Sequence, residues 1–68
     1  MSRTQKQQYL DSALFDHESG EFDGEVVSDL SEVSRGFRGM VLHINDHGNV
    51  TLYRAFANGN VHEVASRV

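Results

Sequence analysis

The sequence predicts an α+β fold in which an N-terminal α-helix packs on a three-stranded antiparallel β-meander. Two observations support this prediction. Residues 4–16 place apolar side chains at helical spacing, and residues 39–67 contain three runs rich in β-branched and aromatic residues, separated by the turn signals NDHGN and ANGN. From the initiating Met1 and the length of 68 residues, we expect a complete small protein with one domain, residues 1–68.

The N-terminal helix is expected over about residues 4–16. Thr4 is a suitable N-cap, and the glutamines and lysine that follow are good helix formers. One stripe of the helix is apolar and consists of Tyr9, Leu10, Ala13 and Leu14. Because so short a helix is marginal alone, it must pack this stripe on another element.

The segment between the helix and the sheet has two interpretations. Val26 and Val27 favour the start of a strand. Ser28 as an N-cap and Gly36 just past the end favour one or two helical turns over about residues 29–35. We expect the short helix and keep the strand as the alternative.

Three strands are expected over about residues 39–45, 50–57 and 60–67. In the first hairpin, a three-residue loop with Gly48 in the left-handed conformation pairs Asn45 with Asn49, Ile44 with Val50, and Leu42 with Leu52. In the second hairpin, Asn58-Gly59 predicts a two-residue type I′ turn. That turn pairs Phe56 with Val61, Arg54 with Glu63, and Leu52 with Ala65.

This register sorts the side chains onto two faces of the sheet. The face expected under the helix carries Met40, Leu42, Ile44, Val50, Leu52, Phe56, Val61 and Ala65. The opposite face carries the row Val41, Tyr53 and Val64, flanked by His43, Thr51, Ser66, Ala55 and His62. Exposed apolar rows often mark association, so we expect a protein interface formed by Val41, His43, Tyr53, His62 and Val64. The alternative is that residues 25–37 fold back and cover this face.

The net charge of −4 is unevenly distributed. Residues 1–32 carry a charge of −6 and residues 33–68 a charge of +2, and residues 16–32 hold seven acids without a base. The acidic stretch is expected to be a solvated loop that aids solubility. The alternative is an acidic surface that docks on a basic partner.

Several kinds of chemistry are excluded or disfavoured by the residues present. The chain has no cysteine, which excludes disulfides and thiolate sites, and it lacks nucleophile-elbow and phosphate-loop motifs. The expected register separates His43 and His62 by roughly 16 Å, too far for one metal ion. We therefore expect no enzyme activity, no cofactor and no metal. Apolar runs of two or three residues predict a soluble, cytoplasmic protein without a membrane span.

The pentapeptide RGFRG, residues 35–39, matches the signature strand of an RNA recognition motif only at Arg35, Gly36 and Phe37. The following positions lack the stacking aromatics, so the match is not evidence for that family. We expect RGFRG to end a helix and begin a strand, with Phe37 as an anchor under the sheet edge. A contact patch for nucleic acid formed by Arg35, Phe37, Arg38 and Arg54 remains as an alternative.

The function expected from these observations is that of a small non-enzymatic interaction module, of the regulatory or adaptor kind that bacteria and phages encode. Without disulfides or a metal, oligomerisation is the ordinary way for a chain this short to bury more surface, so we expect a homo-oligomer such as a dimer. The alternatives are a nucleic-acid-binding protein and an acidic inhibitor of a basic partner. The identity of a protein partner cannot be read from the sequence.

Overall fold

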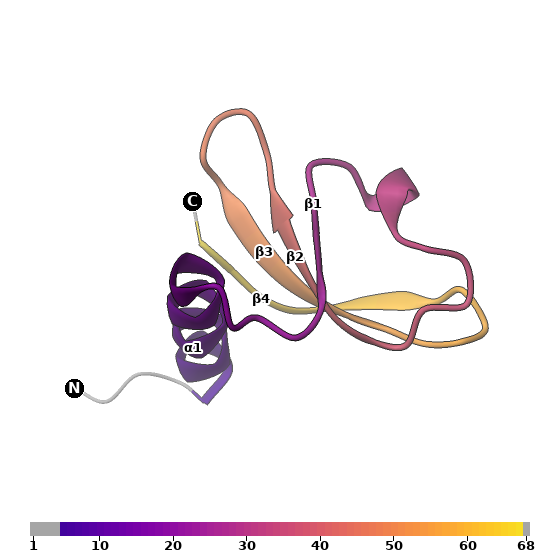
Figure 1. The fold of residues 1–68 in the computed structure, drawn as a ribbon, viewed down its shortest axis with the longest axis horizontal. Coiled ribbons are helices and arrows are strands. Elements are labelled where there is room, and N and C mark those ends of the chain that lie inside the picture. The colour runs from indigo at the N-terminus through magenta and orange to yellow at the C-terminus, as the bar shows by residue number, and fades with distance from the viewer. Residues whose placement is uncertain (1–4, 68) are drawn as a thin grey trace.

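The computed structural model describes residues 5–67 and has one α-helix and a four-stranded mixed sheet (Figure 1). The elements are α1 (Gln5–Ser19), β1 (Glu25–Val27), the 3₁₀ helix η1 (Leu30–Glu32), β2 (Gly39–Ile44), β3 (Val50–Ala55) and β4 (Val61–Arg67). The strand order is β1-β2-β3-β4, with β1 parallel to β2 and the other pairs antiparallel. The α+β class is confirmed, whereas the three-stranded sheet was wrong because β1 adds a fourth strand. Within residues 5–67 no helix has the length and apolar character that crossing a membrane requires.

α1 continues one turn beyond its expected end at residue 16. Gly20 adopts a φ of 80°, and its N–H donates to the carbonyl of His17 while the N–H of Glu21 donates to the carbonyl of Asp16. These two bonds form a Schellman motif, which satisfies the last carbonyls of the helix. Gly20 therefore ends the helix at Ser19. The expected N-cap, Thr4, lies outside the described residues.

The segment after α1 contains both of the structures that its sequence suggested. Glu25–Val27 forms β1, with Val26 opposite Leu42 in parallel register. η1 follows, but its N-cap is Asp29 rather than Ser28, and Glu32 completes a capping box with it. η1 ends at Glu32, so Gly36, with a φ of 80°, lies in a turn in which Phe37 N–H donates to the Ser34 carbonyl.

The first hairpin has the expected register. Asn45 N–H donates to the Asn49 carbonyl and Gly48 N–H to the Asn45 carbonyl, both at 3.0 Å. The Asn45 side-chain Oδ1 accepts from the N–H groups of His47 and Asn49, which further fixes the turn. Ile44 pairs with Val50 and Leu42 with Leu52, as predicted.

The second hairpin has a different turn from the predicted one. Phe56 N–H donates to the Asn60 carbonyl and Gly59 N–H to the Phe56 carbonyl, which repeats the geometry of the first hairpin. This turn needs a positive φ only at Gly59, whereas type I′ would also need one at Asn58; among residues 5–67 every positive φ belongs to a glycine.

The longer turn shifts the register of β3 and β4 by one residue. Val61 pairs with Ala55, His62 with Arg54, and Glu63 with Tyr53, so the predicted pairs Phe56–Val61 and Arg54–Glu63 were wrong. A β-bulge on β4 then restores the predicted pair of Leu52 with Ala65. Val61 consequently lies on the face away from α1, and Val64 lies on the helix side.

The core on the helix side lies between α1 and the parts of β2, β3 and β4 nearer the turn between β2 and β3. Leu10 and Ala13 of the predicted helix stripe meet the sheet there. The buried members of this cluster are Leu10, Ala13, Leu42, Val50, Leu52 and Ala65, and Leu14, Phe22, Met40, Ile44 and Val64 pack at its edge. Phe56, which was expected in this core, is 40% exposed.

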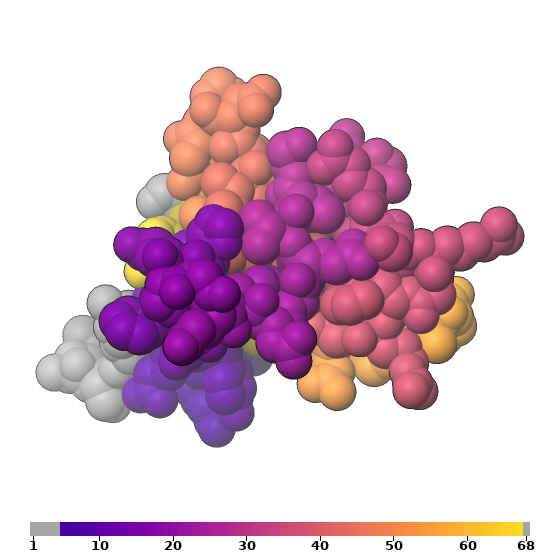
Figure 2. Space-filling view, viewed as in Figure 1, coloured from indigo at the N-terminus to yellow at the C-terminus, as the bar shows by residue number. Residues whose placement is uncertain are grey.

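The opposite face of the sheet is covered by residues 25–37, as the alternative interpretation proposed. Val27, Val41 and Ala55 form its buried cluster, and Val33, Phe37, Tyr53 and Val61 pack around it. The N–H of Ser34 donates to a carboxylate oxygen of Glu25 at 2.9 Å, which ties the two ends of the covering segment together. In Figure 2 the magenta beginning of this segment and its rose end before β2 lie side by side. Phe37 is thus an anchor against the sheet, as expected.

Candidate interaction surface

A groove of about 540 Å³ lies between α1, the loop that follows it and strands β2, β3 and β4. Met40 and Arg54, which pair toward the end of the sheet away from the turn between β2 and β3, line this groove together with Leu52 and Val64. The floor is apolar and consists of Met40, Leu52 and Val64, with Phe22 beside them. We call this depression the helix-side groove. Its walls are Tyr9, Ser12, Ala13 and Asp16 of α1, Asp23 of the following loop, and Arg54 of β3.

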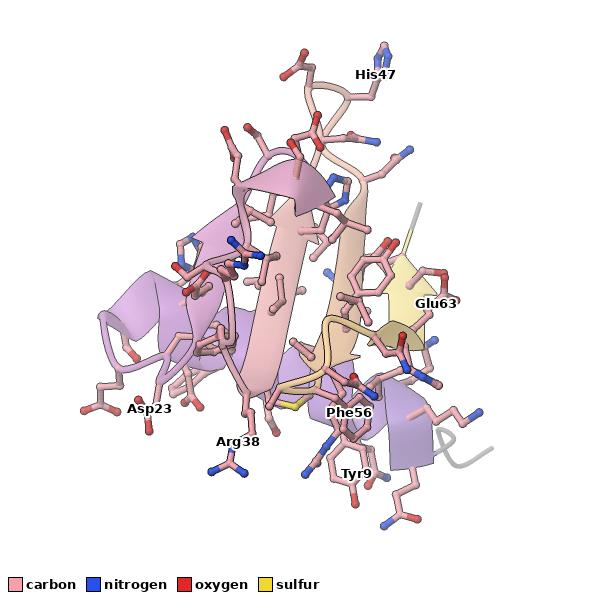
Figure 3. All side chains as sticks on the ribbon, turned by 90° about the vertical axis from the view of Figure 1, so that its right-hand side faces the viewer. Tyr9, Asp23, Arg38, His47, Phe56 and Glu63 are labelled. Atoms are coloured by element: carbon pink, nitrogen blue, oxygen red, sulfur yellow. The ribbon has the colours of Figure 1, made fainter. Side chains whose placement is uncertain are left out.

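Aromatic and cationic side chains meet at one end of the helix-side groove. Arg54 lies over the ring of Phe56, with 5.8 Å from its guanidinium carbon to the ring centroid. His62 meets the same ring edge to face at 5.2 Å. Tyr9, which is 52% exposed, points toward this end of the molecule, as does Phe56 (Figure 3). Rigid aromatic side chains with a polar neighbour are the residue types that dominate the energy of protein interfaces.

Acidic side chains occupy the other end of the groove. Asp16 lies two helical turns after Tyr9, which is roughly 10 Å along α1. Asp23 follows in the loop after α1. In Figure 3 it lies at the lower left of the molecule, away from Tyr9 and Phe56. The groove therefore has an acidic end and an arginine end.

A second, smaller pocket of about 270 Å³ lies between the loop before β2 and the turn between β3 and β4. Arg35, Phe37, Phe56 and Val61 are among its lining residues, and no acid lines it. Between residues 33 and 62 the sequence has one acid, Asp46, which lies in the turn at the opposite end of the sheet.

The arginines of the predicted nucleic-acid patch are all exposed. Arg35 lines the smaller pocket with Phe56, and Arg54 stacks on the same phenylalanine. Arg38 points away from the body of the protein in Figure 3. Phe37, in contrast, is half-buried in the cluster under residues 25–37. Phe56 therefore takes the place of Phe37 as the exposed aromatic beside the arginines.

The residues predicted to form a sheet-face interface are divided between the two faces. Val41 is 0% exposed, so the expected exposed row was wrong: residues 25–37 cover it. His43 and Tyr53 are half-buried on that face and stack edge to face at 6.2 Å, with His43 Nε2 at 3.1 Å from the Ser28 carbonyl. Val64 and His62 lie on the helix side, because the longer turn and the bulge changed their register.

Hydrogen bonds lower the pKa of two carboxyl groups in the covering segment. The Ser34 side chain and N–H lower the pKa of Glu25, and the Ser31 N–H and side chain lower that of Asp29. Both carboxylates hold their own segment together, so they have a structural role. Among residues 5–67 no group of three His, Asp or Glu side chains is arranged to hold a metal ion.

No protein-family model, curated protein or solved structure matches the chain. Sequence reasoning missed the helix-side groove, although it named Tyr9 in the helix stripe and Met40 and Leu52 in the core. The groove could not be predicted because the positions of Phe56 and Val64 depend on the turn between β3 and β4 and on the bulge in β4.

Proposed function

We propose that this chain is a small non-enzymatic protein-interaction module that self-associates through the helix-side groove. The observation that supports this is the half-covered sheet face: an apolar floor is open beside α1, with two large aromatic side chains at its edge. Covering such a groove with a second copy adds the burial that a chain of 68 residues lacks.

Light scattering coupled to size exclusion, over a range of protein concentrations, tests this proposal. The wild type is expected to be a dimer, and Tyr9→Ser is expected to weaken the dimer at least tenfold. Phe15→Ser is the matched control, because Phe15 lies on the same helix, is 71% exposed and does not line the groove. Circular dichroism establishes that both variants fold. A wild type that stays monomeric up to about 1 mM contradicts the proposal.

The second candidate function is binding of single-stranded nucleic acid at the arginine end. It is favoured by the acid-free pocket, the exposed Arg35, Arg38 and Arg54, and the stacked Phe56. Fluorescence anisotropy of a labelled oligonucleotide at two salt concentrations is the test. Phosphate contacts predict an affinity that falls steeply with salt and that Arg38→Ala weakens. An unchanged anisotropy at low salt removes this candidate.

A further inference from the structure

The helix-side groove has opposite charges at its two ends. Asp16 and Asp23 line one end, and Arg54 lines the other, beside Tyr9 and Phe56. Asp23 and Arg54 are exposed and Asp16 is half-buried, so a second molecule seated on the groove would meet all three. The apolar floor of Met40, Leu52 and Val64 lies between them.

Such a distribution is complementary to itself under a two-fold rotation. In a symmetric dimer the same patch is used twice, so that residue i of one copy meets residue j of the other, and residue j meets residue i. A two-fold axis that lies in the plane of the interface, at right angles to the long axis of the groove, places the acidic end of each copy on the arginine end of its partner. A parallel arrangement would instead set like charges against each other, which is unfavourable.

We infer that two copies of this chain meet groove to groove about a two-fold axis, with Asp16 and Asp23 of each copy facing Arg54 of the other. This rests on the proposed self-association and specifies its geometry. The ion pairs form the edge of the interface and set its orientation. The apolar floors and the aromatic side chains of Tyr9 and Phe56 supply the buried area.

A stable interface of standard size buries about 800 Å² on each partner. That is roughly one sixth of the 4935 Å² surface of this molecule. Tyr9 and Arg54 line the groove, and Arg54 stacks on the exposed Phe56, so the surface proposed for the dimer extends from α1 toward the turn before β4.

Charge reversal followed by sedimentation or light scattering tests the inference. Arg54→Asp places acids against Asp16 and Asp23 at both ends of the interface, so it is expected to weaken the dimer at least tenfold. Asp23→Arg is expected to weaken it as well. Arg38→Asp is the matched control, since Arg38 is exposed, carries the same charge and does not line the groove. The control is expected to dimerise like the wild type.

An equimolar mixture of the two weakened variants provides the decisive measurement. In a mixed dimer, one end keeps its natural pairs. At the other end, the arginine introduced at position 23 faces the aspartate introduced at position 54 and offsets the repulsion from the unchanged Asp16. The mixture is therefore expected to recover dimer, and so is the double variant Asp23→Arg/Arg54→Asp. A dimeric wild type whose Arg54→Asp variant is unchanged, or whose mixture stays monomeric, overturns this geometry but leaves self-association intact. A monomeric wild type overturns both.

Discussion

The two faces of the sheet are covered in different ways. On one face, the regular helix α1 contributes to a cluster with six buried residues; on the other, the irregular residues 25–37 contribute to a cluster with three. The helix is straight and covers only the part of the face that it crosses, which leaves the groove. The irregular segment follows the sheet and buries Val41 completely. The regular helix thus contributes to a larger buried cluster than the irregular segment does, but it leaves part of the sheet face that it covers available for a partner.

The largest expected effect comes from comparing two neighbouring residues of β2 that point to opposite faces. Leu42 and Val41 are both 0% exposed. We expect Leu42→Ala to lower the free energy of unfolding by about 2–5 kcal/mol, which would leave a domain of this size largely unfolded. Val41→Ala is expected to cost about 1.5–3 kcal/mol, since fewer methyl groups are lost. Urea denaturation measures both, and a larger loss for Val41→Ala contradicts the ranking of the faces.

The next effect concerns Gly24, where the chain passes from α1 to β1. A Cβ at this position would meet the backbone carbonyl oxygen of Met40 and lie 2.8 Å from the ring of Phe22. Gly24→Ala is therefore expected to cost about 1–3 kcal/mol and to disrupt the pairing of β1 with β2. Hydrogen exchange at Val27 reports on that pairing. Gly20→Ala is the control, because it strains a positive φ in open space and should leave the β1 amides protected.

A smaller effect is expected from pH, and it should be confined to the covering segment. The pKa values of Glu25 and Asp29 are lowered from 4.5 and 3.8 by their hydrogen bonds to Ser34 and Ser31. Because each folded-state pKa lies below its unfolded-state value, the unfolded chain binds more protons in acid. The stabilisation is full above the unfolded-state values and is lost as the pH falls through the folded-state values.

An NMR titration of the amide protons of Ser31 and Ser34 measures this loss. Glu25→Gln should remove the step seen at Ser34 and keep the step at Ser31. A Ser34 step that persists in this variant would mean that another group controls the covering segment.

The smallest effect is expected from the ion pair between α1 and β4. Arg67 Nη2 lies 2.7 Å from Asp11 Oδ1, but the two side chains are 51% and 32% exposed. Water and salt screen such a pair, so Arg67→Ala is expected to cost no more than about 1 kcal/mol. Thermal unfolding at low and high salt measures it. A loss well above this value would show that α1 depends on the ion pair rather than on Leu10 and Ala13.

The parts of the fold that were predicted correctly depend on local signals. The helix stripe at Leu10 and Ala13 and the first hairpin, with Gly48 in its turn, could be assigned because periodicity and turn residues act over a few positions. The parallel pairing of β1 with β2 could not be, because no local turn connects parallel strands and β1 has only three residues.

The candidate surface was predicted less well than the fold, for the same reason. Arg54 was predicted as a possible nucleic-acid contact and Tyr9 as part of the helix stripe. Local sequence signals did not predict that the two side chains line the same groove. A single change of turn length changed the cross-strand partner of Arg54 from Glu63 to His62 and turned Val64 to the helix side, and the bulge that follows then restored Ala65 opposite Leu52. A one-residue shift exchanges the faces of a strand, so small errors in a turn alter an entire surface.

By itself, the sequence determined the helix, the three strands of the meander and the uneven charge, because these follow from periodicity, turn residues and composition. Tertiary structure alone decided the fourth strand, the cover over Val41 and the groove beside α1. These features depend on contacts between residues far apart in the chain. Such contacts form when packing of the whole sheet outweighs small local preferences, such as the choice between two turn types at Asn58-Gly59.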